Sequence, residues 1–240
     1  MFEEERHLYF VDGERVPISI TGVLKKYDPA PFDAGAIIVR CWKAWKRNGK
    51  KPELTEALQG VETDEGAIVA VKSVWNRSSE LGTLLHKRLE ALVNDADTDD
   101  AEFSPVDPDW KQLAKALHGL RWAPIRSELS VFYTNDAGKV VAAGQIDCLA
   151  LDENGDFVMI DLKRSSKTIG PEQTPFRPGE WTEHFRYSLQ LACYSLMVEK
   201  LTGKAVKPTN RYLLVVDSTR ACWVRCLDLD SKARVMLEAL

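Results

Sequence analysis

Residues 158–166 read VMIDLKRSS, and the two charges inside this apolar run decide what kind of fold surrounds them. Alternate residues of a strand point to the same face, so Asp161 and Lys163 project together while Ile160 and Leu162 turn to the other side. Charges close to a core are costly unless other groups pair with them. A salt bridge at a strand end would satisfy this pair, and so would a functional site.

The residues before this run predict two further strands. The three expected strands are SELSVFYT (127–134), KVVAAGQIDCLAL (139–151) and DFVMIDLK (156–163), separated by NDAG and DENG. Turns this short predict an antiparallel meander. Neighbouring strands lie about 4.8 Å apart, so Asp147 of the middle strand can meet Asp161 when the register allows it. Two opposed carboxylates repel unless a cation lies between them, and oxygen ligands suit Mg²⁺ or Mn²⁺.

Helical periodicity predicts a helix on either side of this meander. We expect SSELGTLLHKRLEALVND to begin at a Ser78 or Ser79 cap, after a separate helix over about residues 64–76. Four-residue spacing places Gly82, His86 and Glu90 on one face of it. A satisfied, partly buried histidine would give the same pattern.

The second helix, TEHFRYSLQLACYSLMVEKLTG, is expected to begin after Thr182 and to end at Gly203. A polar line borders its apolar face and comprises Arg186, Tyr187, Gln190 and Tyr194. The polar shoulder of an ordinary helix is the alternative interpretation. Two strands and a last helix from Asp230 complete the predicted order.

The N-terminal part is expected to be mostly helical. HLYFVDGERVPI predicts a hairpin with its turn at Asp12 and Gly13, and SITGVLKKY predicts a short helix. The helix AGAIIVRCWKAWKRNGKK is basic and aromatic, which suits phosphate contact and base stacking, and equally suits a core face of tryptophans. Its candidate DNA-binding residues are Trp42, Lys43, Trp45, Lys46 and Arg47. We expect an N-terminal hairpin and helical extension over residues 1–78 and a core domain over residues 79–240.

Composition is that of a globular protein, with 45% hydrophobic and 28% charged residues. No apolar run approaches the roughly 18 residues of a membrane span, and the acidic N-terminus lacks the apolar segment of a secretory signal. Five cysteines without framework spacing favour reduced thiols. We therefore expect a cytoplasmic protein, of cellular or phage origin, without a membrane partner.

The net charge of −4 does not exclude a nucleic-acid partner, because the acidity is concentrated. Residues 94–109 hold seven acids and no Lys or Arg, and the remainder of the chain carries +3. We expect this acidic segment to be a solvated loop, which leaves the rest free to present a basic surface.

Four motifs resemble, in this order, those of the PD-(D/E)XK nuclease superfamily. They are G-x3-H-x3-E (82–90), G-x2-D (144–147), D-L-K (161–163) and Q-L-x2-Y (190–194). The match is to the RecB-like exonuclease branch, which includes CRISPR-associated exonucleases, the mitochondrial genome maintenance exonuclease and phage relatives. The resemblance covers about residues 79–217. It implies an α/β fold with a restriction-endonuclease-like core, in which a central mixed β-sheet is flanked by helices in α-β-β-β-α-β order.

The resemblance implies a metal-dependent deoxyribonuclease, and we expect an exonuclease acting on single-stranded DNA ends in DNA repair, recombination or replication. It assigns Mg²⁺ or Mn²⁺ to His86, Asp147, Asp161 and the carbonyl of Leu162. Lys163 would orient or activate the attacking water and stabilise charge on the phosphate, as such hydrolysis requires.

Further roles follow from the same resemblance. Gln190 and Tyr194 would hold the substrate backbone or support Lys163. Glu90 and Glu128 would support the metal ligands without binding the metal themselves. Other candidate DNA contacts, in or near the long loop 164–181, are Lys167, Arg177, Arg186 and Tyr187.

Two departures from the family pattern qualify these expectations. Ile146 precedes Asp147 where many members have Pro. Some relatives hold an iron–sulfur cluster with four cysteines, but here Cys222 and Cys226 form a C-x3-C pair and Cys41 is isolated, so we expect no cluster. The alternatives are a non-catalytic nucleic-acid-binding module on the same fold, and an endonuclease.

Overall fold

The computed structural model describes residues 2–3, 8–27, 32–96, 100–167, 169–170 and 182–240. The chain divides into two compact units. The sheet unit comprises Met1–Asp28 and Leu85–Leu240, and the helical unit comprises Pro29–Leu84. Among the described residues, no helix combines the length and apolar character that a bilayer span requires.

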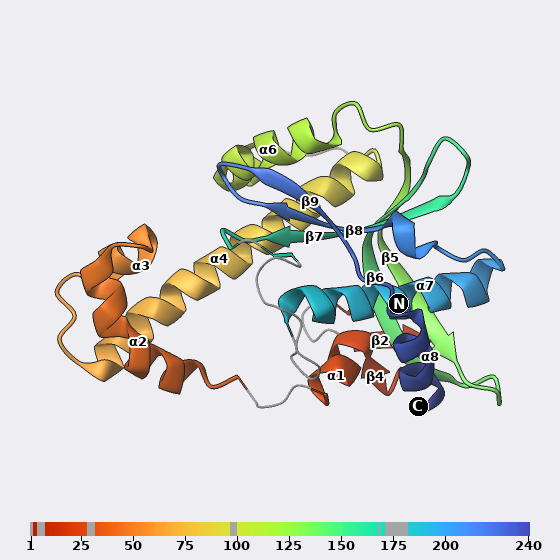
Figure 1. Ribbon diagram of the computed structural model, residues 1–240, viewed down its shortest axis with the longest axis horizontal. Helices are drawn as coiled ribbons and strands as arrows, with labels where there is room; N and C mark the ends of the chain where they lie inside the picture. Colours follow the sequence, from red (N-terminus) through yellow and green to blue (C-terminus); the bar gives the residue numbers. More distant parts are fainter. Residues whose placement is uncertain (1, 4–7, 28–31, 97–99, 168, 171–181) are drawn as a thin grey trace. The chain divides into compact units, whose positions relative to one another are not determined.

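A six-stranded mixed sheet forms the centre of the sheet unit (Figure 1). Its strands are β4 (Ile18–Ser19), β5 (Ala123–Thr134), β6 (Val140–Leu151), β7 (Phe157–Arg164), β8 (Arg211–Val216) and β9 (Ala221–Arg225). The pairs β5–β6, β6–β7 and β8–β9 are antiparallel, whereas β4–β6 and β7–β8 are parallel. The predicted meander and the predicted mixed α/β fold are therefore confirmed.

One edge of β6 is shared between two strands, and this arrangement creates the site. β4 pairs with Ala142 and Ala143, whereas β7 pairs only from Cys148 to Leu151. Residues 144–147 lie between these two ladders, and we call this stretch the fork. Backbone N–H and C=O groups that lack ladder partners inside a protein need other partners. At the fork, side chains supply them.

Helix α7 (Glu183–Thr202) packs on the sheet, with contacts to β5, β6, β7 and β8 (Figure 1). The Thr182 hydroxyl accepts a hydrogen bond from the Phe185 N–H at 3.1 Å, and Gly203 ends the helix with a φ of 73°. Both predicted boundaries are confirmed. Every residue from Ser188 to Val198 is buried, so α7 forms the centre of the core. Helices α1 (Ile20–Lys25) and α8 (Asp230–Glu238) pack against it.

The remaining elements of the sheet unit are short. A small sheet holds β1 (Phe2–Glu3), β2 (Leu8–Val11) and β3 (Glu14–Arg15). The predicted hairpin turn is confirmed, because Asp12 and Gly13 between β2 and β3 have φ values of 50° and 83°. The other helical elements are α5 (Asp100–Phe103), η1 (Ser104–Val106), α6 (Asp107–Leu117) and η3 (Pro208–Asn210).

The helical unit holds α2 (Ala34–Asn48), α3 (Pro52–Ala57) and the first part of α4 (Asp64–Val93). Its core comprises Ile38, Trp42, Leu54, Leu58, Ala67 and Val71. The two predicted helices over 64–76 and from residue 79 are one continuous helix, so a cap at Ser78 or Ser79 was wrong. Extending a helix is much easier than nucleating a new one, and two serines cost too little to break it.

The acidic segment is also more ordered than a solvated loop. It contributes α5, η1 and the start of α6, and it buries Phe103 and Val106. Asp107 lies 2.5 Å from Arg88, and the buried Asp109 lies 3.0 Å from Arg164. Two of its seven acids therefore pair with basic side chains of α4 and β7.

Arg211, the first residue of β8, provides a test of the core. Its side chain is 1% exposed, pairs with Asp230 of α8, and donates to Ser195 Oγ at 2.9 Å. We expect Arg211→Ala to lower the free energy of unfolding by about 3 kcal/mol or more, because it leaves buried polar groups unpaired. Urea denaturation measures this. Arg121→Ala is the matched control: that residue pairs with Glu153 at 2.8 Å but is 79% exposed, so its loss should change stability by less than about 0.5 kcal/mol.

Candidate functional site

The side chain of Asp147 replaces a backbone carbonyl as the hydrogen-bond acceptor where β6 and β7 separate. Its carboxylate Oδ2 accepts a hydrogen bond from the Leu162 N–H at 2.7 Å. The β6–β7 ladder ends at the pair Cys148 and Ile160, so Asp147 and Asp161 lie one position beyond the last pair. The structure thus brings the two predicted carboxylates together at the point where the strands separate.

Lys163 lies between these two carboxylates. Its Nζ is 2.7 Å from Asp161 Oδ2 and 3.8 Å from Asp147 Oδ2, and it donates to the Leu162 carbonyl at 3.3 Å. Asp161 is 3% exposed, and this burial raises its pKa to about 6 against the opposing effect of Lys163. Burial disfavours the lysine charge as well, but Asp161 and Asp147 outweigh it and hold the pKa of Lys163 above its ordinary value. At neutral pH the site therefore keeps its ion pair.

His86 of α4 completes the contacts of Leu162. Its Nε2 lies 2.9 Å from the Leu162 carbonyl, and its Nδ1 lies 3.3 Å from Glu128 Oε1 and 3.7 Å from Asp147 Oδ2. Burial lowers the pKa of His86, but Asp147 and the hydrogen bond with Glu128 outweigh burial and raise the pKa to about 9. Both ring nitrogens face acceptors, which favours the imidazolium.

Glu128 lies among the candidate metal ligands, whereas only a supporting role was expected of it from the sequence. Among the described residues, the group able to hold a metal ion is His86, Glu128 and Asp147, whose ligand atoms all lie within 4.8 Å of one another. Glu128 has a φ of 51° inside β5, a left-handed conformation that costs a non-glycine residue about 1–3 kcal/mol. Such strain persists only where the surroundings enforce it.

Side chains also replace the ladder beside Glu128. The pairs Ser127–Cys148 and Leu129–Ile146 flank it, and no pair forms between Glu128 and Asp147 themselves. Instead, Ser127 Oγ donates to the Asp147 carbonyl at 2.6 Å, and Gln145 Nε2 donates to the Glu128 carbonyl at 3.2 Å. Both edges of β6 are therefore irregular at the site.

Tyr194 and Gln190 support the site from α7. Tyr194 is 4% exposed, and its hydroxyl accepts a hydrogen bond from Gln190 Nε2 at 3.1 Å. The same Gln190 nitrogen lies 3.5 Å from Asp161 Oδ1. Burial raises the pKa of Tyr194 well above its ordinary value. Of the two roles considered from the sequence, this placement fits support of the charged residues better than substrate contact.

Tyr9 of β2 is a residue near the site that sequence reasoning missed. It is 8% exposed and packs with Val16 and Ala143. Burial raises the pKa of Tyr9 to about 12, and the nearby carboxylates of Glu128 and Asp147 add to this effect. Nothing in the hairpin sequence indicates that this ring, rather than its neighbours, turns toward the carboxylates.

Other predicted site residues of the sheet unit lie around this centre. Glu90 is half-buried one turn beyond His86 on α4 and is not a member of the metal-holding group of described residues. Arg186 is half-buried, and the exposed Lys167 lies 3.8 Å from Glu183. The ring of Tyr187 lies under the Lys163 ammonium, 5.0 Å from ring centroid to Nζ. Arg177 falls outside the described residues.

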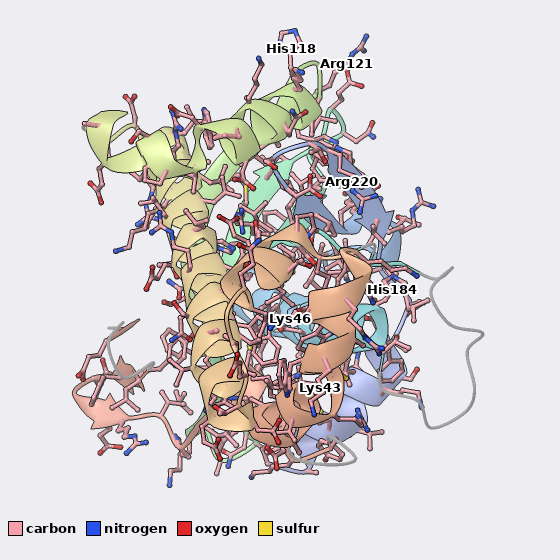
Figure 2. The ribbon with its side chains drawn as sticks, turned by 90° about the vertical axis from the view of Figure 1, so that its left-hand side faces the viewer. Lys43, Lys46, His118, Arg121, His184 and Arg220 are labelled. Atoms are coloured by element: carbon pink, nitrogen blue, oxygen red, sulfur yellow. The ribbon has the colours of Figure 1, made fainter. Side chains whose placement is uncertain are left out.

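The tryptophans of α2 belong to the core of the helical unit. Trp42 is 4% exposed and its indole N–H donates to Asp64 at 2.7 Å, while Trp45 meets Trp75 edge-on at 6.5 Å between centroids. Lys46 donates to the Val61 carbonyl at 2.7 Å. The buried ring of Trp42 has no free face for the base stacking expected of it. Lys43 projects from the same helix (Figure 2), and Lys43 and Arg47 remain exposed.

Gly144 of the fork is required by the ring of Tyr194. A Cβ at Gly144 would lie 2.1 Å from Tyr194 Cε1, closer than packed atoms come. We expect Gly144→Ala to lower the free energy of unfolding by about 1–3 kcal/mol, because the buried ring must move. Thermal or urea denaturation measures the loss. Gly35→Ala is the control, since its Cβ would meet Asp33 at an ordinary 3.4 Å. Equal stability of Gly144→Ala and wild type would contradict this placement of Tyr194.

Comparison with known proteins gives one family. The family model described as the PD-(D/E)XK nuclease superfamily matches residues 98–225. No curated protein matches the chain. A solved structure titled "Crystal structure of SSO0001" is 17% identical, with 90% of this chain and 82% of that chain covered and a TM-score of 0.38. Because the family match takes in more than half of the chain, including Asp147, Asp161 and Lys163, the protein belongs to the PD-(D/E)XK nuclease superfamily.

Proposed function

We propose that the protein is a metal-dependent deoxyribonuclease that hydrolyses DNA phosphodiester bonds, and that it acts as an exonuclease on single-stranded ends. One observation carries the proposal. At a single break in the sheet, the carboxylates of Asp147 and Asp161 flank the Lys163 ammonium, and the imidazole of His86 lies 3.7 Å from Asp147 Oδ2. A purely structural salt bridge needs neither the second carboxylate nor the histidine. Phosphodiester hydrolysis uses all of them.

The donor set fits a divalent cation. Carboxylates, one imidazole and a backbone carbonyl are a mainly oxygen ligand set, which suits Mg²⁺ or Mn²⁺. Asp161 Oδ2 is buried and receives no well-aligned hydrogen bond from the described residues, although Lys163 lies beside it. We assign the metal to Glu128, Asp147, Asp161, the Leu162 carbonyl and His86, whose imidazolium would lose a proton to become a ligand. When bound, such an ion supplies Lewis acidity at a phosphate oxygen and a more acidic water.

The protein's own side chains account for the remaining requirements. The Lys163 side chain is 23% exposed, so its ammonium can reach an incoming phosphate while Asp161 holds it. There it orients the attacking water and offsets the charge that develops on the phosphate. Gln190 and Tyr194 support the site indirectly, because Gln190 lies 3.5 Å from Asp161 and donates to the Tyr194 hydroxyl.

Exposed basic residues on α2 favour a nucleic-acid substrate. Arg40, Lys43 and Arg47 are exposed and spaced three and four residues apart, so they line one face of the helix. Rows of Lys and Arg bind the phosphate backbone without reading sequence. We take DNA ends exposed in repair, recombination or replication as the substrate. The competing proposals are a non-catalytic DNA-binding module and an endonuclease.

Substitution of a metal ligand tests the chemistry. We expect Asp147→Asn to reduce cleavage of labelled DNA by about 10³-fold or more, because it removes a ligand charge from the metal centre. The fold should persist, since the asparagine oxygen can still accept from the Leu162 N–H. Wild-type cleavage should require Mg²⁺ or Mn²⁺. The control is Asp136→Asn in an exposed turn, which should leave cleavage unchanged. Full activity in EDTA would contradict the proposal, and DNA binding without cleavage in either metal would favour the non-catalytic module.

Substrate topology tests the exonuclease assignment. We expect linear single-stranded DNA to be digested and a covalently closed circle of the same sequence to persist, because an exonuclease needs a free end. Gel analysis over time, with the label placed internally in both substrates, makes the comparison direct. Equal rates on the two substrates would establish an endonuclease. Faster digestion of duplex than of single strands would contradict the single-strand preference.

A further inference from the structure

The ammonium of Lys163 has an aromatic neighbour in addition to its carboxylates. Its Nζ lies 5.0 Å from the centroid of the Tyr187 ring, within the range of a cation–π contact. Tyr187 is half-buried and packs against the main core of the sheet unit, and burial raises the pKa of its hydroxyl. The ring is therefore held in place rather than free on the surface.

The backbone that carries Tyr187 is also fixed. It lies in the first turns of α7, where Thr182 accepts hydrogen bonds from the N–H groups of Phe185 at 3.1 Å and Arg186 at 2.9 Å. A capped helix start and a packed ring together define where the aromatic face points. One face of the ring is thereby directed at Lys163.

We propose that Tyr187 is a positioning residue, whose ring holds the Lys163 ammonium at the fork by a cation–π contact. This inference rests on the proposed nuclease function. It replaces the DNA contact expected for Tyr187 from the sequence. Lysine has a long flexible stem with many rotamers, so its charge stays in one place only if several groups hold it.

An aromatic partner suits this position better than a third carboxylate would. Asp161 and Asp147 attract the ammonium, but they are also the proposed metal ligands. Their negative charge is therefore divided between the ammonium and the metal ion. An additional carboxylate would compete for the metal and repel a phosphate. The neutral ring of Tyr187 does neither, and its attraction for the ammonium does not depend on the state of the carboxylates.

The first experiment measures the contact itself. Protein labelled with ¹³C at the lysine ε carbon gives one resonance for each lysine, and Lys163→Arg identifies that of Lys163. We expect the ε protons of Lys163 to be shifted upfield by the Tyr187 ring, the shift to be lost in Tyr187→Leu, and the shift to be retained in Tyr187→Phe. Lys200, 4.7 Å from the ring centroid of Tyr133, is the internal reference. A Lys163 resonance that does not respond to Tyr187→Leu would overturn the proposal, whether or not the protein cleaves DNA.

The second experiment measures the consequence for turnover. We expect Tyr187→Leu to lower kcat roughly tenfold, with KM and the DNA affinity measured in EDTA close to wild type, since a desolvated cation–π contact has about this strength. Tyr187→Phe should keep most of kcat. Tyr133→Leu, which removes the equivalent ring from Lys200 away from the fork, should leave kcat unchanged.

Combination with Lys163→Ala separates positioning from independent roles. If Tyr187 acts through the ammonium, Tyr187→Leu should cause no further loss of kcat in the Lys163→Ala background. A further loss there, or weaker DNA binding with unchanged kcat, would make Tyr187 a substrate contact. A loss in Tyr187→Phe as large as in Tyr187→Leu would assign the role to the hydroxyl instead of the ring. An inactive wild type would refute the nuclease proposal alone, because the resonance shifts still decide the contact.

Discussion

The site depends on the edge of β6 that β4 and β7 share. Between the two ladders the backbone needs hydrogen-bond partners from side chains, because buried N–H and C=O groups are otherwise costly. Asp147 accepts from the Leu162 N–H, His86 contacts the Leu162 carbonyl, and Ser127 donates to the Asp147 carbonyl. The polar residues that could hold a metal thus also complete the sheet. Their presence at the fork follows from backbone chemistry as much as from any reaction.

Local patterns made much of this arrangement predictable. The alternation of a strand places Asp161 and Lys163 on one side of β7, and caps and periodicity define α7. The position of Glu128 was not predictable. The NDAG turn pairs Asn135 with Lys139, and this register would place Glu128 opposite Ile146. An irregularity between Tyr133 and Thr134 shifts the register by one residue, so Glu128 faces Asp147 instead. A register shift of one residue moves every following side chain to the other face of the sheet relative to its partner strand. No residue type in the strand predicts this shift.

The basic helix shows a different limit of sequence reasoning. Trp42 and Trp45 fit a core face and a stacking platform equally well, because both uses require aromatic rings on one side of a helix. The hydrogen bond from Trp42 to Asp64 fixes the Trp42 ring in the core. Asp64 lies 22 residues away in the chain, so this contact cannot be read from the local sequence pattern. Continuity of α4 through Ser78 and Ser79 is a similar case, since weak local preferences yield to the cooperativity of a long helix.

The charge balance of the fork explains why the proposed chemistry needs a cation. Three carboxylates, those of Glu128, Asp147 and Asp161, are set against the two cationic side chains of His86 and Lys163. The raised pKa of Asp161 reflects a carboxylate that its buried surroundings disfavour. A DNA phosphate that approached this group directly would meet excess negative charge, and Lys163 alone cannot offset it because Asp161 already pairs with it. A divalent ion removes that excess, because with His86 neutral as a ligand the three carboxylates are balanced by Lys163 and the ion. The aromatic face of Tyr187 then becomes important for a simple electrostatic reason: it attracts the ammonium without adding a negative charge to a site that must admit a polyanion.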